Sequence, residues 1–330
     1  MKDDEFISVV SPLLNQADIL RDFVRETHAI LASSYTNYEI ILVNGSSSDD
    51  THPVIDALLQ EYSCLRFIQL TSDYGKDISI YAGLEQAIGD YVVVLFPNSD
   101  PPGMIPETVR MCQKSQRIVF GSLQTPSRYS ILIACLSWCF LFYCRRFLKL
   151  TLPRFTTDYR VLSRQVVNAV TQIKDRYPFV KIYGSAVGFG SLPYTYEPIN
   201  RRGDSSGRGV LQRINEGIEI IMSSSKHPLR LCSRLGLLAG FAYLAWNTAI
   251  SLVSPPFGTA DNSLTVLLPH SLMMLVIVVT AAVVCEYLGR VLEESRSRPL
   301  YHVLFEKNSN VMLSDDRRNV LRQGVRVQES

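Results

Sequence analysis

The chain has 330 residues, enough for one sizeable folded core and a further segment. It carries 33 basic and 31 acidic residues, a formal charge of +2, and therefore lacks the general positive field that nucleic-acid binding requires. We expect no nucleic acid as a partner. Mean hydropathy is +0.09 and 47% of the residues are hydrophobic, which indicates a soluble part joined to a membrane part.

The first third of the chain alternates short apolar runs with stretches of helical spacing. Strands are predicted at 6–10, 38–43, 65–70, 91–95 and 118–120, and helices at 19–31, 53–62, 78–88 and 104–113. This alternation predicts an α/β fold with a mostly parallel, doubly wound sheet. Ligands bind such sheets beyond the carboxyl ends of the strands, which here are the loops 11–17, 44–51, 71–76 and 96–103.

These four loops together have the polar content that a nucleotide needs. Asn15 and Gln16 can bond a base or a ribose, and residues 46–50 offer hydroxyl groups and carboxylates just before a helix. Lys76, which follows a glycine, can contact a phosphate; as a single lysine it can equally be a solvated surface residue. For Asp50 a plain helix N-cap is the alternative.

Residues 130–150 are apolar up to Cys144 and basic after it, with Arg145, Arg146 and Lys149. Fourteen apolar or small residues are few for a membrane span, so the pattern favours a helix lying in the membrane interface, with Trp138 and Phe142 inserted. A short third span is the alternative.

Two uncharged stretches, at about 235–253 and 263–285, are each long enough to cross a bilayer as a helix. The turn between them has no Lys or Arg, whereas basic residues precede the first stretch and follow the second. The positive-inside rule then predicts a two-helix hairpin with both ends of the chain in the cytoplasm. A pair of buried core helices is the alternative reading.

Several segments, taken in order, resemble one family of enzymes. The runs ISVVSPLLNQ, YEIILVNGSSSDDT, SDYGKDISIYAGLEQAIGDYVVV and SDPP resemble family 2 glycosyltransferases of the GT-A fold. The later runs TTDYRVLSRQVV, RRGDSS and EYLGRVLEESRSRPLYHV resemble the polyprenyl-phosphate glycosyltransferases, which include the dolichyl-phosphate mannose synthases. The resemblance covers about residues 6–305.

The resemblance implies transfer of a sugar from a nucleotide-sugar to a polyprenyl phosphate, with inversion, for the synthesis of cell-surface glycans. It also implies Mg²⁺ or Mn²⁺ on the leaving diphosphate, an inner (cytoplasmic) membrane location and homo-oligomers. The donor-binding residues it implies are Pro12, Asn15, Gln16, Asn44, Ser46, Lys76 and Asn98. The catalytic residues it implies are Asp158 and Asp100, the latter with Asn98 at the metal.

On the acceptor side, Asp158-Tyr159-Arg160 matches the family's D-[FY]-R motif. The candidate ligands of the lipid phosphate are Arg128, Arg160, Arg201 and Arg202. Attraction to the membrane surface without a specific role is the alternative for each arginine.

The chain departs from the family at its acidic positions. Asn44-Gly45 replaces two aspartates, Gln16 replaces a glutamate, and Phe96 and Asn98 replace acids of the D-x-D-x-D-P-P pattern, in which Asp100 remains. Mg²⁺ and Mn²⁺ prefer anionic oxygen ligands. Two functions are therefore carried forward: an active glycosyltransferase with an altered donor site, and a pseudo-glycosyltransferase that serves as a lipid-phosphate-binding or scaffold subunit.

The predicted organisation has four parts. Residues 1–125 form the nucleotide-sugar half, and 126–228 the acceptor side with the interfacial helix. Residues 229–290 hold the two membrane helices, and 291–330 form a cytosolic tail whose polar end is either an arm or disordered.

Overall fold

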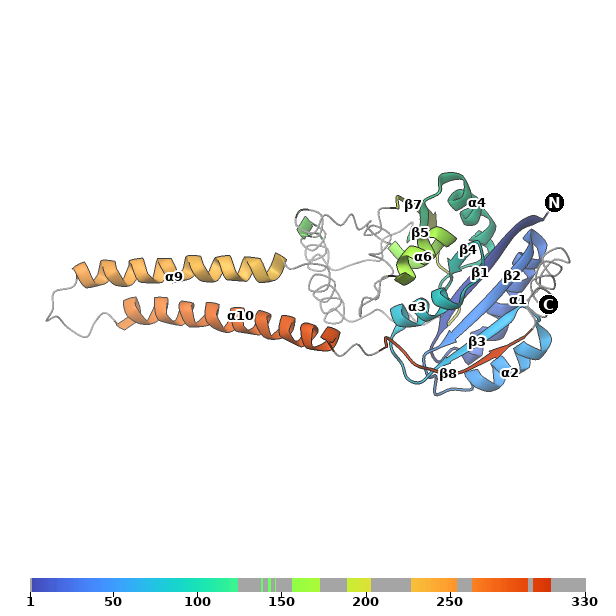
Figure 1. Cartoon of the computed structure of the whole chain (residues 1–330), viewed down its shortest axis with the longest axis horizontal. Helices are drawn as coiled ribbons and strands as arrows, with labels where there is room; N and C mark the ends of the chain where they lie inside the picture. Colours follow the sequence, from blue (N-terminus) through green and yellow to red (C-terminus); the bar gives the residue numbers. More distant parts are fainter. Residues whose placement is uncertain are drawn as a thin grey trace, which may run out of the picture. The chain divides into compact units, whose positions relative to one another are not determined.

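The structure of the chain is a computed structural model. It describes residues 2–123, 156–172, 189–202, 227–253, 263–295 and 299–309, together with Trp138, Phe142, Tyr143 and Arg146. The described residues divide into two compact units, one built on a sheet and one containing two long helices (Figure 1).

The first unit is an eight-stranded sheet in the order β7-β5-β6-β4-β1-β2-β3-β8. The strands are β1 Asp3–Leu13, β2 Tyr35–Asn44, β3 Leu65–Leu70, β4 Tyr91–Val94, β5 Ile118–Leu123, β6 Thr156–Ser163, β7 Ser191–Tyr196 and β8 Val303–Asn308. Strands β1 to β4 pair in parallel, and β5 pairs in parallel with β7. Strand β6 runs antiparallel between β4 and β5, and β8 runs antiparallel to β3. The predicted mostly parallel α/β sheet is thus confirmed.

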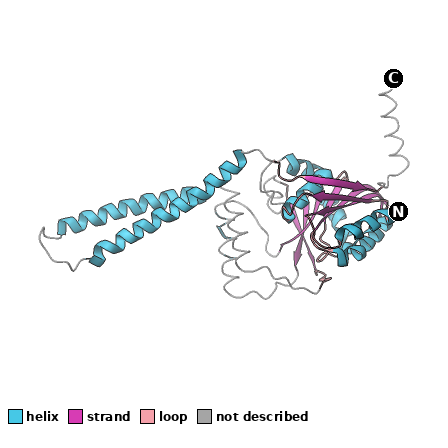
Figure 2. Cartoon of the chain, turned by 90° about the horizontal axis from the view of Figure 1, so that it is seen from below, coloured by secondary structure: helices cyan, strands magenta, loops and turns pink. Residues whose placement is uncertain are grey.

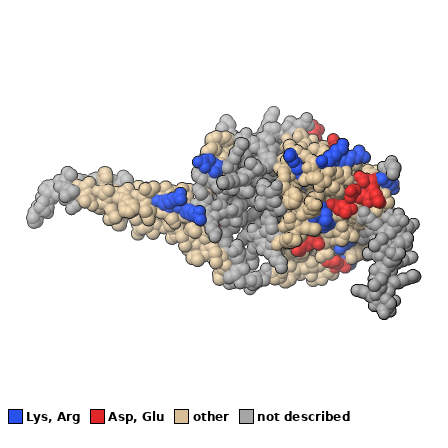
Figure 3. Space-filling view, turned by 45° about the horizontal axis from the view of Figure 1, so that its top comes forward, with Lys and Arg blue, Asp and Glu red and all other residues tan. Residues whose placement is uncertain are grey.

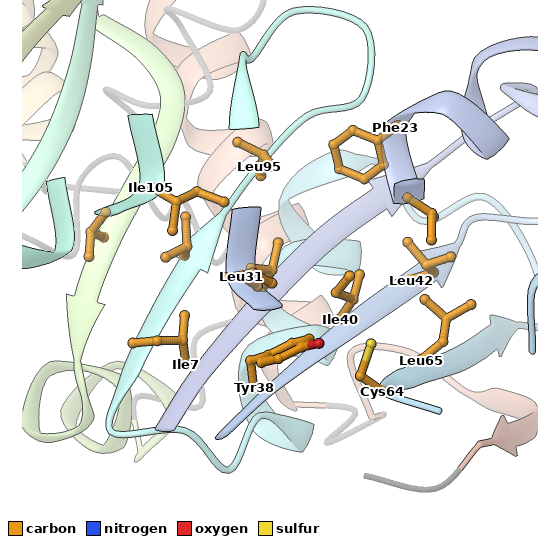
Figure 4. Packing of buried hydrophobic residues seen from close by; sticks show 14 of the residues in the cluster. Ile7, Phe23, Leu31, Tyr38, Ile40, Leu42, Cys64, Leu65, Leu95 and Ile105 are labelled. Carbon is orange, nitrogen blue, oxygen red and sulfur yellow. The ribbon is translucent and has the colours of Figure 1, made fainter. Parts of the chain in front are cut away.

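Helices cover both faces of this sheet (Figure 2). They are α1 Ala17–Ser34, α2 Thr51–Glu61, α3 Lys76–Gln86, the 3₁₀ turn η1 Pro102–Met104, α4 Ile105–Ser115 and α6 Arg164–Gln172. Because successive strand residues point to opposite faces, each strand supplies two separate cores. One core packs against α1, α2 and α4 and includes Ile40 and Leu42 (Figure 4). The other packs against α3 and α6 and includes Ile41 and Val43.

Helix α3 lies very close to the sheet. A Cβ on Gly83 would be 2.3 Å from Val10 Cγ1 and 3.1 Å from Val43 Cγ2, so only glycine permits this approach without a shift. The close packing fixes the position of α3, which begins at Lys76. The sequence had instead predicted Lys76 as the last residue of the preceding loop.

The sequence did not predict β8. The polar end of the tail, from Glu306 to Ser330, was expected to be an arm or disordered, yet its first residues, 306–308, complete the strand Val303–Asn308 on the edge of β3. Its Phe305 ring packs 6.0 Å from the Phe67 ring, and Thr71 N–H donates to His302 O just before the strand (3.0 Å). These contacts hold the start of the tail against the sheet.

The second unit contains α9 His227–Val253 and α10 Ser263–Ser295, which pack against each other. Within it, Tyr243 Oη and His270 Nδ1 lie 3.0 Å apart. Among the residues described, one stretch, 269–289, is long and apolar enough to cross a membrane. The predicted interfacial helix at 130–150 lies largely outside the described residues; the exposed rings of Trp138 and Phe142 stack with centroids 5.6 Å apart.

A buried ion pair holds the sheet at the end opposite the candidate site. Glu39 is fully buried and accepts bonds from Ser8 Oγ (2.6 Å), Ile88 N–H (2.9 Å) and Arg66 Nη1 (3.0 Å). Ser8 Oγ also accepts from Gly89 N–H at 2.8 Å. The network therefore joins β1, β2 and β3 to the turn that leads from α3 into β4.

We predict that Glu39→Ala lowers the free energy of unfolding of the sheet unit by about 3–5 kcal/mol, because it leaves the Arg66 guanidinium buried without its partner. The control is Glu61→Ala, which removes an exposed ion pair with Arg21 and should cost less than about 1 kcal/mol. Urea titration of the full-length protein in detergent, followed by circular dichroism, measures both. Equal effects would contradict the assignment of Glu39 as a core anchor.

Candidate active site

The loops that follow β1 and β2 are fastened to each other. Asn15 N–H donates to Ser47 Oγ (2.8 Å), and Ser48 N–H donates to Asn15 Oδ1 (2.8 Å). Asn15 and Ser46 have positive φ values of 52° and 69°, which tight turns favour for such short polar residues. The structure thus brings together Asn15 and Ser46, two of the predicted donor-binding residues.

Asn44, at the end of β2, is fully buried and shapes the same loop. Its Nδ2 donates to Gln69 Oε1 on β3 (2.8 Å), and its Oδ1 accepts from Ser47 Oγ (2.5 Å). Pro12, another predicted donor residue, is buried beside Val43 in the parallel register of β1 and β2. Asn44 and Pro12 are therefore buried beneath the loops that follow β1 and β2.

The start of α1 is held by an aspartate that the sequence had not singled out. Asp49 Oδ2 accepts from Ala17 N–H (3.0 Å), and its Oδ1 accepts from Thr51 N–H (3.2 Å). Burial opposes ionisation, but the bonds from Thr51 and Ala17 prevail and lower the pKa of Asp49. Asp50 does occupy the N-cap position of α2, as the alternative for it expected, but the side chain that bonds the first residue of α2 is that of Asp49. Gln16 Oε1 is buried and has no hydrogen-bond partner among the described residues.

Lys76 connects the donor loops to the acceptor motif. It follows Gly75, whose φ of 87° turns the chain into α3. The Lys76 ammonium lies 2.7 Å from Asp158 Oδ2 on β6, with 30% of the lysine side chain and 16% of the aspartate side chain exposed. Two predicted site residues that are 82 positions apart are therefore in direct contact.

Asp100 is sealed inside its own loop. It is 1% exposed, and it accepts from Phe96 N–H (2.9 Å), Ser99 Oγ (3.1 Å) and Tyr196 Oη (2.6 Å). Burial raises the pKa of Asp100 to about 6, although these three donors favour the carboxylate. Its oxygens therefore serve to fold the loop, and Tyr196, on β7, is a partner that no sequence motif indicated.

Phe96 follows the end of β4, and Asp158 lies on the neighbouring strand β6. Val94, the last residue of β4, pairs with Arg160 in the antiparallel register of the two strands, two residues after Asp158. The Phe96 side chain is half-buried and packs against the core on the α3 face of the sheet.

The segment around residues 199–202 lies along the β4 loop and α1. Ile199 N–H donates to Ser99 O (2.9 Å), and Arg202 N–H donates to Asn98 Oδ1 (3.2 Å). Arg201 forms a bidentate pair with Glu26 at 3.0 and 2.6 Å. The Arg202 guanidinium bonds both Asp18 oxygens and the Asn15 carbonyl oxygen. Hydrogen bonds from these arginines lower the pKa of Glu26 and of Asp18.

Both arginines were predicted to bind the lipid phosphate, and both are engaged with carboxylates of α1 in this structure. Arg160, a third candidate, is 5% exposed. Its Nη1 donates to Thr157 O and Tyr159 O, both at 2.6 Å, and its guanidinium lies 5.7 Å from the Phe120 ring centroid. Burial lowers the Arg160 pKa, and nearby Asp158 opposes that shift. Arg128, the fourth candidate, lies outside the described residues.

The residues present do not fit a divalent metal. Phe96 has no side-chain oxygen, Asp100 is buried under three donors, and Asn98 Oδ1 accepts from a backbone amide. Within the described ranges, no group of three or more His, Cys, Asp or Glu residues is arranged to hold an ion. The predicted metal ligands Asp100 and Asn98 therefore have other partners here.

Comparison with known proteins identifies the family. Residues 8–171 match the family described as Glycosyl transferase family 2. An uncharacterized glycosyltransferase from Synechocystis is 27% identical over 90% of this chain and 94% of its own. A bactoprenol glucosyl transferase from Shigella phage SfV is 27% identical over 91% and 99%, respectively. An undecaprenyl-phosphate 4-deoxy-4-formamido-L-arabinose transferase from Yersinia pestis is 25% identical over 90% and 92%.

The α/β sheet has polar loops at the carboxyl ends of its parallel strands, which is where sheets of this kind bind their ligands. The chain belongs to glycosyltransferase family 2. Among solved structures, mannosyl-3-phosphoglycerate synthase from Rubrobacter xylanophilus is similar over 70% of this chain and 75% of its own, with 17% identity and a TM-score of 0.47. That likeness is too distant to inform the site.

We predict that Tyr196→Phe destabilises the β4 loop more at pH 8 than at pH 5. With the Asp100 pKa near 6, the carboxyl is ionised at pH 8, and a hydrogen bond to a charged acceptor is worth about 2 kcal/mol against about 1 for a neutral one. The Asp100 carboxyl binds its proton more tightly in the folded state than in the unfolded state. Its protonation therefore stabilises the fold fully below about pH 4, and this contribution is lost as the pH rises through about 6. Thermal unfolding at both pH values measures the difference.

Tyr194→Phe is the matched control on the same strand. Tyr194 Oη donates to Glu107 Oε2 (2.7 Å) at an exposed site, so its loss should be small and nearly the same at both pH values. An equal effect of pH on the two variants would contradict the sealed-loop assignment.

Proposed function

We propose that this protein transfers a sugar from a nucleotide-sugar to a polyprenyl phosphate, with inversion at the anomeric carbon. The observation that carries the proposal is the length of the likeness. It covers nine-tenths of this chain and of two relatives named for bactoprenol and undecaprenyl-phosphate acceptors. It therefore extends well past residue 171, where the family match ends, into the part that contains α9 and α10.

The geometry supports this chemistry. In the proposed reaction a phosphate oxygen of the lipid attacks the anomeric carbon, a carbon–oxygen bond forms, and the bond to the nucleoside diphosphate breaks. The attacking phosphate is already anionic, so its main requirements are orientation and exclusion of water. We assign Asp158 to the reacting centre, because it lies between Lys76 on the donor side and Arg160 on the acceptor strand. Asp100 is assigned to positioning the loop.

We also propose that α9 and α10 form a membrane hairpin with both ends of the chain on the cytoplasmic side. The apolar side chains of the two helices support this: large residues are exposed all along them, among them Leu237, Phe241, Leu275 and Val278. Figure 3 shows the described part of this region mainly as uncharged residues, with one group of basic residues. Apolar surface on this scale is stable only when another apolar phase covers it.

The topology is tested with two variants, each of which adds one cysteine to the seven of the native sequence, at Ser254 or at the exposed Glu306. In intact cells a membrane-impermeant maleimide should label a cysteine at 254 and leave one at 306 unlabelled until the membrane is opened. The control is a chain without added cysteines. Labelling of both positions in intact cells would contradict the proposed orientation.

The transfer activity is tested with membranes that contain the full-length protein and undecaprenyl phosphate. Radiolabelled UDP-glucose, UDP-N-acetylglucosamine and GDP-mannose are supplied one at a time, and the organic phase is analysed for a lipid-linked sugar. We expect product with at least one donor. Asp158→Asn should lower the rate at least about 100-fold, as expected for losing an electrostatic group at the reacting centre.

Asp56→Asn is the control for that substitution. Asp56 is half-exposed and pairs with Lys307 on β8, so the rate should remain within about twofold of the parent. Absence of product with every donor from a protein that still binds UDP or GDP would favour the pseudo-glycosyltransferase instead.

A further inference from the structure

The described part of the β4 loop offers a metal ion no free anionic oxygen. Its one acid, Asp100, is 1% exposed, and both carboxylate oxygens accept hydrogen bonds from within the fold. The Asn98 amide oxygen accepts from Arg202 N–H. The side chain at the first position of the loop is the phenyl ring of Phe96, packed on the core. A hard divalent cation selects anionic oxygen, so this loop selects against it.

The Lys76 ammonium supplies a positive charge at the same end of the sheet as the β4 loop. Asp158 lies on β6, two residues before the Arg160 that pairs with the last residue of β4, and its charge acts on Asp100 of the β4 loop. The Lys76 ammonium lies 2.7 Å from Asp158 Oδ2. Lys76 is the first residue of α3, so its charge lies at the carboxyl end of the parallel strands, where the loops after β1, β2 and β3 also end.

The three loops meet around this position. Gly45 N–H, after β2, donates to Leu13 O at the end of β1 (3.0 Å). A Cβ on Gly45 would lie 3.4 Å from Asp73 Oδ1, and Asp73 in turn accepts from Gly75 N–H (2.9 Å) just before Lys76. These contacts join the three loops to one another just before α3 begins at Lys76.

We propose that this chain binds the diphosphate of its nucleotide donor without a divalent metal, and that the Lys76 ammonium supplies the cation. The inference rests on the proposed function in one respect, namely that the donor is a nucleotide-sugar. An ammonium has three N–H donors and can bond Asp158 and diphosphate oxygens at the same time. Asp158 keeps the lysine side chain extended toward the site, which lowers the entropy lost when phosphate binds.

The same pair disfavours a metal at Asp158. An ion that used Asp158 as its ligand would lie within a few ångströms of the Lys76 charge, and like charges at that distance repel strongly where water is partly excluded. Lys76 and a divalent ion are thus alternatives at this position rather than partners.

The test is calorimetric titration of the full-length protein in detergent with UDP and with GDP, each in excess EDTA and in Mn²⁺. We expect one of the two nucleotides to bind with a dissociation constant that differs less than threefold between EDTA and Mn²⁺. Binding that strengthens tenfold or more in Mn²⁺ would overturn the proposal. Failure of both nucleotides to bind in either condition would overturn it as well.

Variants test the role of the lysine itself. Lys76→Met should weaken nucleotide binding in EDTA at least tenfold, and Lys76→Arg, which keeps the charge, should restore most of the affinity. Lys307→Met is the matched control, because Lys307 also pairs with an aspartate but lies on β8, and it should bind as the parent does. Equal affinity of Lys76→Met and the parent would overturn the proposal. If Lys76→Met fails to fold, the arginine variant and the EDTA titration of the parent decide.

A gain-of-function variant gives an independent readout. Phe96→Asp combined with Asn98→Asp adds two carboxylate groups to the loop, and nucleotide binding by this variant should become tighter in Mn²⁺ than in EDTA. Sugar transfer that requires Mn²⁺ in the parent would overturn the metal-free inference and leave the proposed function standing. Metal-free nucleotide binding without any sugar transfer would overturn the proposed function and leave the metal-free inference standing.

Discussion

The antiparallel pairing of β6 with β4 is the constraint on which the site depends. Strands β1 to β4 form a parallel sheet whose loops lie together at the carboxyl ends of the strands. Strand β6 brings the later part of the chain to the same end of the sheet. Its register places Arg160 beside Val94 and so carries Asp158 to the end of β4. A slip of one residue would turn both side chains to the opposite faces of the sheet. The Lys76–Asp158 contact, and with it the link between the donor loops and the acceptor motif, would then be lost.

Periodicity predicted each strand and α-helix of the first 123 residues, but not the 3₁₀ turn η1. Strand β3 is found at the predicted bounds, and β4 and α2 differ from them by one or two residues, because apolar runs that end at polar loops leave few alternatives. Strand β8 escaped prediction for a physical reason. Val303–Asn308 has a mixed polar composition typical of an edge strand, and its partner, β3, lies more than 230 positions earlier in the chain.

The candidate site was predictable where it rests on local motifs and was not where it rests on distant contacts. Lys76 and Asp158 were identified separately, and the structure adds that they touch. The burial of Asp100 depends on Tyr196, 96 positions away, which no motif marks. Likewise the arginines at 201 and 202 attract attention as phosphate ligands in the sequence, whereas their carboxylate partners on α1 become visible only once the chain is folded. Local sequence patterns thus identify the candidate side chains, and tertiary contacts determine which of them remain available to bind a ligand.

The position of β8 has a consequence for the order in which the protein is made. Strand β3 is synthesised early, but the strand that covers its edge follows α9 and α10 in the chain. Until residue 308 has left the ribosome, the backbone groups along that edge have no strand to pair with, and an open edge of this kind promotes association between nascent chains. Closure of the sheet therefore has to wait for synthesis of both long helices. A chain that stops within α10 would have a nearly complete sheet in which the β3 edge is unpaired and can associate with other chains.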